Sequence, residues 1–233
     1  MLRLAAALIG SYLLGSIPAA FIAGRARGID LRQHGSGNLG ATNVIRVLGA
    51  RIGILVFAFD MLKGAAPTML FPKWVPVDAM PLGNPLIFAI LCGVCAIAGH
   101  TRPVFLGLGK GGKGVATAAG VFLALAPIQT ALVLLVFAVV LWSSGYVSLG
   151  SLTSAMLLPV LLGLTVGPRS PLFVISVVIA LFVFWTHRAN IQRLRKGEEH
   201  RFGKKGTATK RPGPFVAIAF VIAAAILVAA RFG

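Results

Sequence analysis

Long apolar runs separated by short polar segments make up most of the chain. Eight runs approach the roughly 20 residues that a helix needs to cross a bilayer. They lie at 2–23, 51–71, 82–99, 115–131, 130–147, 149–166, 170–186 and 214–230. The fourth and fifth meet indistinctly near Pro127. The pattern predicts an all-α polytopic membrane helix bundle of seven transmembrane helices, with a possible C-terminal eighth at 214–230. We expect a membrane-embedded domain over 1–211 and an apolar extension over 212–233.

The polar segments between the runs differ in charge. Basic residues gather in three of them, at 24–50, 100–114 and 187–213. The connections at 72–81 and 167–170 carry only Lys73 and Arg169. Because cytoplasmic loops are enriched in Lys and Arg, the three basic segments are predicted to share the cytoplasmic face, with the N-terminus outside.

Composition narrows the class of protein. The chain has 233 residues, of which 58% are hydrophobic and 12% charged, and these proportions exclude an ordinary soluble domain. Its formal charge of +17 comes from 22 Lys and Arg against five acids. Anionic lipid headgroups or phosphorylated substrates are the expected partners, and the apolar runs argue against nucleic acid. Cys92 and Cys95 form a C-x-x-C pair inside an apolar run, but they lack further ligands, so we predict small core residues.

The segment from Gly107 to Thr117 is the most distinctive of the chain, with the sequence G-L-G-K-G-G-K-G-V-A-T. Glycine lets consecutive N–H groups turn toward one point, and such a concavity attracts an anion. Lys110 and Lys113 add charges that suit phosphate. The nucleotide P-loop pattern fails at Gly114, where that motif has Ser or Thr. We predict a phosphate cradle without nucleotide machinery; a flexible basic loop is the alternative.

A second polar segment, 35–46, has the sequence G-S-G-N-L-G-A-T-N-V-I-R. Its hydroxyl and amide side chains precede Arg46, which lies at helical spacing from Thr42 and Asn43. An arginine binds phosphate through two parallel N–H bonds. The segment is either part of a phosphate site or simply a helix-capping turn.

Asp60 and Lys63 lie inside the second apolar run, three residues apart and so on one helix face. The helical rise puts Asp60 about 13 Å beyond Arg51. Charges at such depth need partners or a cavity. We expect a mutual ion pair that locks helix packing, or a contribution to the polar pocket.

Further polar groups fall at the ends of runs on the same predicted face. His100 ends the third run, and His187 ends the seventh. Ser148 and Ser151 are three residues apart and share one side of a helix, although such hydroxyls often bond only to backbone carbonyls. Segment 188–196 is predicted to form a short surface helix with Arg193, Arg195 and Lys196 toward anionic headgroups. Together these polar segments of the predicted cytoplasmic face indicate one pocket that is rich in cationic side chains and hydrogen-bond donors. Because no carboxylates cluster there, no metal or other cofactor is expected.

At these segments the chain resembles the bacterial acyl-phosphate:glycerol-3-phosphate acyltransferase family of PlsY type. The resemblance is carried by 35–46, D-M-L-K-G at 60–64, A-G-H-T-R-P-V-F at 98–105, G-K-G-G-K-G-V-A-T at 109–117, Y-V-S-L-G-S at 146–151 and H-R-A-N-I-Q-R-L at 187–194. It covers about residues 10 to 202. It implies a seven-helix inner-membrane enzyme that moves a fatty acyl group from acyl phosphate to the sn-1 hydroxyl of glycerol 3-phosphate, giving lysophosphatidate and phosphate.

The resemblance also assigns residues. The catalytic roles it implies fall on Ser36, Arg46, Lys113, His187 and Asn190. The positions it implies for substrate or phosphate binding are Asn38, Thr42, Asn43, His100, Lys110, Gly111, Gly112, Gly114, Thr117, Ser148 and Ser151. Asp60, Lys63 and Glu199 are expected to be structural, and no metal ligands are expected.

The expected mechanism of acyl transfer follows from the use of acyl phosphate, which is an already activated acyl donor. Acyl phosphate needs no acyl-enzyme serine, and its own phosphate oxygen is the expected proton acceptor, with His187 as the fallback base. A membrane transporter of a phosphorylated metabolite is the alternative function. Transporter sites lie at helices broken near the midplane, whereas the glycine segments here lie at the ends of runs.

Overall fold

The structure, a computed structural model, describes residues 1–202, and these contain helices and no strand. The predicted run 214–230 and the extension from 212 lie outside the described residues. The all-α prediction is therefore confirmed for the part of the chain that is described. By its internal contacts the chain divides into two compact units, Met1–Ala126 and Pro127–Gly233.

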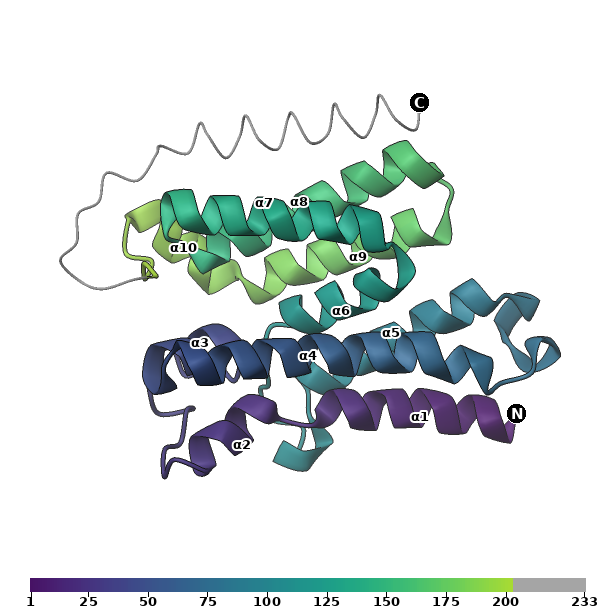
Figure 1. Cartoon of the computed structure of the whole chain (residues 1–233), viewed down its shortest axis with the longest axis horizontal. Helices are drawn as coiled ribbons and strands as arrows, with labels where there is room; N and C mark the ends of the chain where they lie inside the picture. Colours follow the sequence, from purple (N-terminus) through teal and green to yellow (C-terminus); the bar gives the residue numbers. More distant parts are fainter. Residues whose placement is uncertain (203–233) are drawn as a thin grey trace. The chain divides into compact units, whose positions relative to one another are not determined.

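The first unit holds six α-helices (Figure 1). They are α1 (Leu2–Ser16), α2 (Ala19–Arg25), α3 (Ala41–Leu48), α4 (Ala50–Leu70), α5 (Pro85–Thr101) and α6 (Val115–Leu125). Short 3₁₀ turns connect them: η1 (Phe71–Lys73), η2 (Val77–Ala79), η3 (Pro81–Gly83) and η4 (Val104–Leu106). Pro18 separates α1 from α2, and Gly49, at φ 93°, turns the chain from α3 into α4. Only glycine adopts that backbone conformation readily.

Five helical stretches within residues 1–202 are long and apolar enough to cross a membrane. They are Leu2–Arg25, Ala50–Lys73, Pro85–Leu106, Pro127–Ser144 and Val147–Val166. A sixth stretch, Pro171–Thr186 with Arg188–Lys196, is bent by 59°. The chain is thus a multi-pass membrane protein, but seven spans are not reproduced among the described residues.

The difference from seven spans lies in α6. Residues 115–131 look long enough to span, yet α6 has 11 residues and ends at Leu125, and Pro127 begins the next helix. Eleven residues extend about 16 Å, roughly half of the hydrocarbon core. Proline is suited to a helix start because its missing N–H is not needed there. The predicted single run therefore contains one short helix and the beginning of another.

Helix α4 lies at the centre of the first unit and packs closely against its neighbours. A Cβ at Gly53 would overlap Ile45 of α3, and one at Gly64 would overlap the Thr117 carbonyl of α6. Gly120 of α6 approaches Met61 in the same way. Small residues allow such close approach between membrane helices, where dispersion contacts replace the hydrophobic effect.

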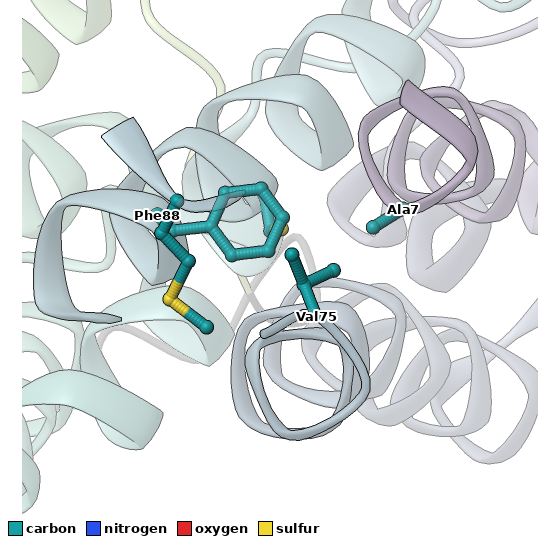
Figure 2. Close-up of a cluster of buried hydrophobic side chains, with 5 residues drawn as sticks. Ala7, Val75 and Phe88 are labelled. Carbon is teal, nitrogen blue, oxygen red and sulfur yellow. The ribbon is translucent and has the colours of Figure 1, made fainter. Parts of the chain in front are cut away.

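Helices α1 and α5 also pack tightly, and a hydrophobic cluster lies at the end of the unit where α5 begins. Figure 2 shows this cluster, in which Ala7, Val75 and Phe88 meet Met80 and Cys92. Cys92 is fully buried there, which confirms its expected place in the core. Cys95 is half-buried.

The second unit is described from α7 to residue 202. Its helices are α7 (Pro127–Ser144), α8 (Val147–Val166), α9 (Pro171–Thr186) and α10 (Arg188–Lys196). Helix α8 packs against both α7 and α9 and buries Leu161 and Leu162 completely. The bounds of α10 match the short helix predicted at 188–196.

Candidate active site

The glycine loop, residues 107–114, leaves α5 and folds back onto its end. The N–H of Gly111 donates to the Thr101 carbonyl at 3.0 Å, and that of Gly112 donates to the His100 carbonyl at 3.2 Å. The loop therefore returns to the level of His100 before α6 begins, which explains why α6 is short. The glycine pattern predicted that the N–H groups of this loop bind an anion, but those of Gly111 and Gly112 are hydrogen-bonded to carbonyl groups at the end of α5.

Lys113 and the first turn of α6 follow at once. Gly114 is the N-cap of α6, with φ 83° and no side chain to cap the helix. The first N–H groups of any helix lack intrahelical acceptors and attract an anion. Thr117, in this first turn, is fully buried, and its Oγ1 has no hydrogen-bond partner among the described residues. The anion-binding capacity of the loop therefore lies at the start of α6, beside Lys113, while Lys110 is exposed.

His100 joins α4 to the glycine loop. Its Nδ1 lies 3.5 Å from Asp60 Oδ1. On the other side of the ring, a Cβ at Gly112 would overlap Nε2, so the loop backbone lies directly against the imidazole. His100 is 6% exposed and is held between a carboxylate and a glycine.

The predicted pair of Asp60 and Lys63 is present. Lys63 Nζ lies 2.8 Å from Asp60 Oδ1, and both side chains are 3% exposed. Lys63 Nζ also donates to the Ile17 carbonyl, at the break between α1 and α2, at 2.9 Å. Each buried charge thus has a partner, as burial requires.

The first polar segment is organised by Asn43. Its Oδ1 accepts the Ser36 N–H at 2.8 Å, and its Nδ2 donates to the His34 carbonyl at 3.0 Å and to the Leu31 carbonyl at 3.3 Å. Asn43 is 1% exposed, so it holds the turn that carries Ser36. Arg46, on the same short helix, is exposed.

The remaining residues of that segment take intermediate positions. Ser36 is exposed, whereas Asn38 and Thr42 are half-buried. One hydrophobic cluster joins α3 to the segment that leads into the glycine loop, because Leu39 and Val44 are buried in it and Leu106 packs against it. The two predicted phosphate segments therefore share a core within the first unit.

In the second unit, the side chain of Glu199 accepts hydrogen bonds from three other side chains. Its carboxylate accepts hydrogen bonds from Ser148 Oγ at 2.9 Å, Asn190 Nδ2 at 2.6 Å and Arg193 Nε at 2.7 Å. Burial raises the pKa of Glu199, but the bonds from Asn190, Arg193 and Ser148 outweigh burial and lower its pKa overall. Arg193, which was predicted to face lipid headgroups, forms an ion pair with Glu199, and the orientation toward headgroups stays a prediction.

His187 and Ser151 bond to their own helices. Nδ1 of His187 lies 2.8 Å from the Val183 carbonyl, which can only accept, so this nitrogen carries a proton. Ser151 Oγ donates to the Val147 carbonyl at 3.0 Å. Nε2 of a neutral His187 is consequently the basic nitrogen.

Two polar residues of α1 support the site without having been predicted. Tyr12 Oη donates to the Arg102 carbonyl at 2.7 Å, and Ser16 Oγ accepts the Val104 N–H at 3.4 Å. Both fix the segment between α5 and the glycine loop. Their spacing of four residues within an apolar run was the available signal.

Comparison with known proteins shows the family of the chain. A family model described as glycerol-3-phosphate acyltransferase matches residues 5–197. The chain is 45% identical over 197 residues to the glycerol-3-phosphate acyltransferase of Geotalea daltonii, covering 84% of this chain and 95% of the relative. It is 49% identical over 195 residues to that of Geobacter metallireducens, with the same coverage.

Two solved structures are also similar. Both are of PlsY, an integral membrane glycerol 3-phosphate acyltransferase. Its glycerol 3-phosphate form has a TM-score of 0.77 at 39% identity, covering 86% of this chain and 96% of that one. Its lysophosphatidic acid form has a TM-score of 0.74 at 38% identity, covering 86% and 95%.

Proposed function

Because the chain belongs to the glycerol-3-phosphate acyltransferase family, we propose that it uses acyl phosphate as its donor and acylates the sn-1 hydroxyl of glycerol 3-phosphate. The observation that carries the donor assignment is the glycine loop, which presents Lys113 and the N-terminus of α6 together. Family membership favours this enzyme over a transporter of a phosphorylated metabolite.

Two phosphate groups must be held for this reaction, and each carries about −1.5 to −2 charges at neutral pH. Lys113 and the first turn of α6 bind one of them. Arg46, exposed at the end of α3, supplies the bidentate contact that a phosphate accepts. Ser36, positioned by Asn43, adds a hydroxyl donor. Holding both substrates in place supplies the proximity that solution lacks.

The acyl transfer needs no covalent enzyme intermediate. The sn-1 oxygen of glycerol 3-phosphate attacks the acyl carbonyl carbon, and a new C–O bond forms. The bond between that carbon and the phosphate oxygen breaks, and phosphate leaves. The hydroxyl proton passes to an oxygen of the leaving phosphate, and His187 Nε2 is the fallback acceptor. Lys113 offsets the charge on the tetrahedral oxyanion. Within the second unit, the carboxylate of Glu199 holds the side chain of Asn190, to which the family resemblance assigns a catalytic role.

No metal enters this reaction. Mg²⁺ would need clustered carboxylates, and three of the five acids already bind cationic side chains. These ion pairs are Asp30 with Arg25 and Arg32, Asp60 with Lys63, and Glu199 with Arg193. Hydrogen bonds from Arg32 lower the pKa of Asp30, so this acid remains a charged partner of its arginines.

The reaction takes place at the cytoplasmic face of the inner membrane, with residues 1–211 as one membrane-embedded acyltransferase domain. The supporting observation is charge: segments 24–50, 100–114 and 187–213 hold most of the Lys and Arg residues. The glycine loop and the Arg46 helix both belong to this basic set.

The donor is tested with purified protein in detergent micelles, given glycerol 3-phosphate and equal concentrations of acyl phosphate, acyl-CoA or acyl carrier protein. Lysophosphatidate should form from acyl phosphate alone. Lys113→Ala should lower kcat/KM by about 100-fold, in line with the loss of a charge at a preorganised site. Preference for a thioester donor, or near-normal transfer by Lys113→Ala, would contradict the proposal.

A further inference from the structure

Asp60, Lys63 and His100 are buried ionisable groups to which the proposed reaction gives no step. A buried ion pair costs desolvation energy, which favourable geometry must offset. Asp60 and Lys63 meet that condition at 2.8 Å. Their burial requires an explanation beyond helix packing, because an apolar pair of similar size would pack as well.

The position of His100 suggests what the pair does. The Asp60 carboxylate, fixed by Lys63, lies 3.5 Å from His100 Nδ1. A carboxylate beside one ring nitrogen keeps the proton there and sets the orientation of the imidazole. The other nitrogen, Nε2, then faces the backbone of Gly112.

The glycine loop wraps around the same histidine. Gly112 N–H donates to the His100 carbonyl, and a Cβ at Gly111 would overlap that carbonyl oxygen. Both glycines therefore lie directly against His100, Gly111 at its carbonyl oxygen and Gly112 at its ring. Lys113 is the next residue, so its backbone position depends on this contact.

We propose that Asp60 and His100 are positioning residues for the glycine loop. Asp60, held by Lys63, orients the His100 imidazole. The ring and carbonyl of His100 in turn fix the path of Gly111 and Gly112, and so place Lys113 at the N-terminus of α6. The functional half of this inference rests on the proposed binding of a substrate phosphate by Lys113.

The test compares purified His100→Ala with His100→Asn. The asparagine amide reaches the position of Nδ1 and keeps a donor for Asp60, whereas alanine keeps none. His100→Ala should weaken binding of glycerol 3-phosphate, measured by calorimetry, or raise KM for one of the two substrates, by at least about 10-fold. His100→Asn should fall between His100→Ala and wild type, because it keeps the donor toward Asp60 but lacks the ring atoms that lie against Gly112.

A second readout does not depend on catalysis. Amide hydrogen exchange of residues 111–114 should speed up at least about 10-fold in His100→Ala, because the N–H bonds of Gly111 and Gly112 would open more often. Asp60→Leu/Lys63→Met removes both charges together, along with the acceptor beside His100 Nδ1, and avoids leaving one charge unpaired. It should produce the same exchange change, and adding His100→Ala to it should add little, since coupled residues are not additive.

Thr68→Val is the matched control, because Thr68 is buried on α4 and its hydroxyl donates to the Gly64 carbonyl of the same helix. It should leave substrate binding and loop exchange at the wild-type values. Wild-type exchange and wild-type binding in His100→Ala and in Asp60→Leu/Lys63→Met would overturn the inference. Should His100→Ala fail to fold, Asp60→Leu/Lys63→Met decides on the same two measurements. Faster exchange in the variants, combined with normal activity of Lys113→Ala, would refute only the phosphate assignment.

Discussion

Substitution of Gly112 by alanine would place a methyl group onto the His100 imidazole. The new Cβ would overlap Nε2 and lie 2.5 Å from Cε1, whereas ordinary van der Waals contact begins at 3.4 Å. The ring cannot retreat freely, because Asp60 lies on its other side. The loop must therefore move by about 1 Å, and Lys113 moves with it.

A displacement of about 1 Å in a reacting geometry costs about 100-fold in rate, or roughly 2.7 kcal/mol of transition-state stabilisation. We expect Gly112→Ala to lower kcat/KM by this amount, measured as initial rates of lysophosphatidate formation from acyl phosphate and glycerol 3-phosphate. The melting temperature should change little, because the resulting movement is confined to the loop.

Gly109→Ala is the matched substitution in the same loop. Its Cβ would come no closer than 3.1 Å to the Leu106 carbonyl, a contact that a small shift relieves, so the loss should stay below about fivefold. Asparagine at position 100 lacks the Nε2 and Cε1 atoms, so His100→Asn should partly restore Gly112→Ala. Activity of Gly112→Ala within threefold of wild type, or no restoration by His100→Asn, would refute this account of the loop.

Three further predictions concern other groups of the site. Arg46→Lys loses the two parallel N–H bonds and should raise KM for a phosphorylated substrate about three- to tenfold; unchanged kinetics would exclude Arg46 from phosphate binding. EDTA should leave the rate of acyl transfer intact, and inhibition that Mg²⁺ reverses would contradict a metal-free reaction. Glu199→Gln should lower the melting temperature by roughly 2–4 °C near neutral pH. The native state lowers the pKa of Glu199 below its usual 4.5. The stabilisation that the Glu199 carboxylate gives to the folded state is therefore complete above pH 4.5 and is lost as the pH falls through the native pKa. The difference between wild type and Glu199→Gln should therefore shrink in acid, and a constant difference would contradict this assignment.

Features set by local spacing were predictable from the sequence. Residues three apart on a helix meet, so the pairing of Asp60 with Lys63 followed directly from the chain. The glycine loop and the start of a helix after it followed from composition. The helix at 188–196 followed from Ile191 and Leu194, which lie three residues apart and so on one side of a helix, among basic residues.

Features set by contacts between segments were not predictable. A count of apolar residues does not show at which depth in the membrane a helix begins. The glycine loop folds back to His100 before α6 begins, so the short length of α6 could not be predicted from its hydropathy. Nor does a glycine pattern tell which acceptor an N–H group finds; those of Gly111 and Gly112 bond to the end of α5. Asn43 and Glu199 organise their surroundings through bonds across several residues, and the sequence gives no geometric sign of these.

The spacing of Asp60 and Lys63 also bears on how the protein is made. A single charge at the centre of a helix costs about 2.5–3.5 kcal/mol during translocon-mediated insertion, and Ala50–Lys73 is the least apolar of the five candidate spans among residues 1–202. Since the counterion is carried on the same helix, Asp60 and Lys63 can enter the lipid as a neutral pair before α5, with His100, has been synthesised. Insertion of this pair therefore needs no counterion from the rest of the bundle.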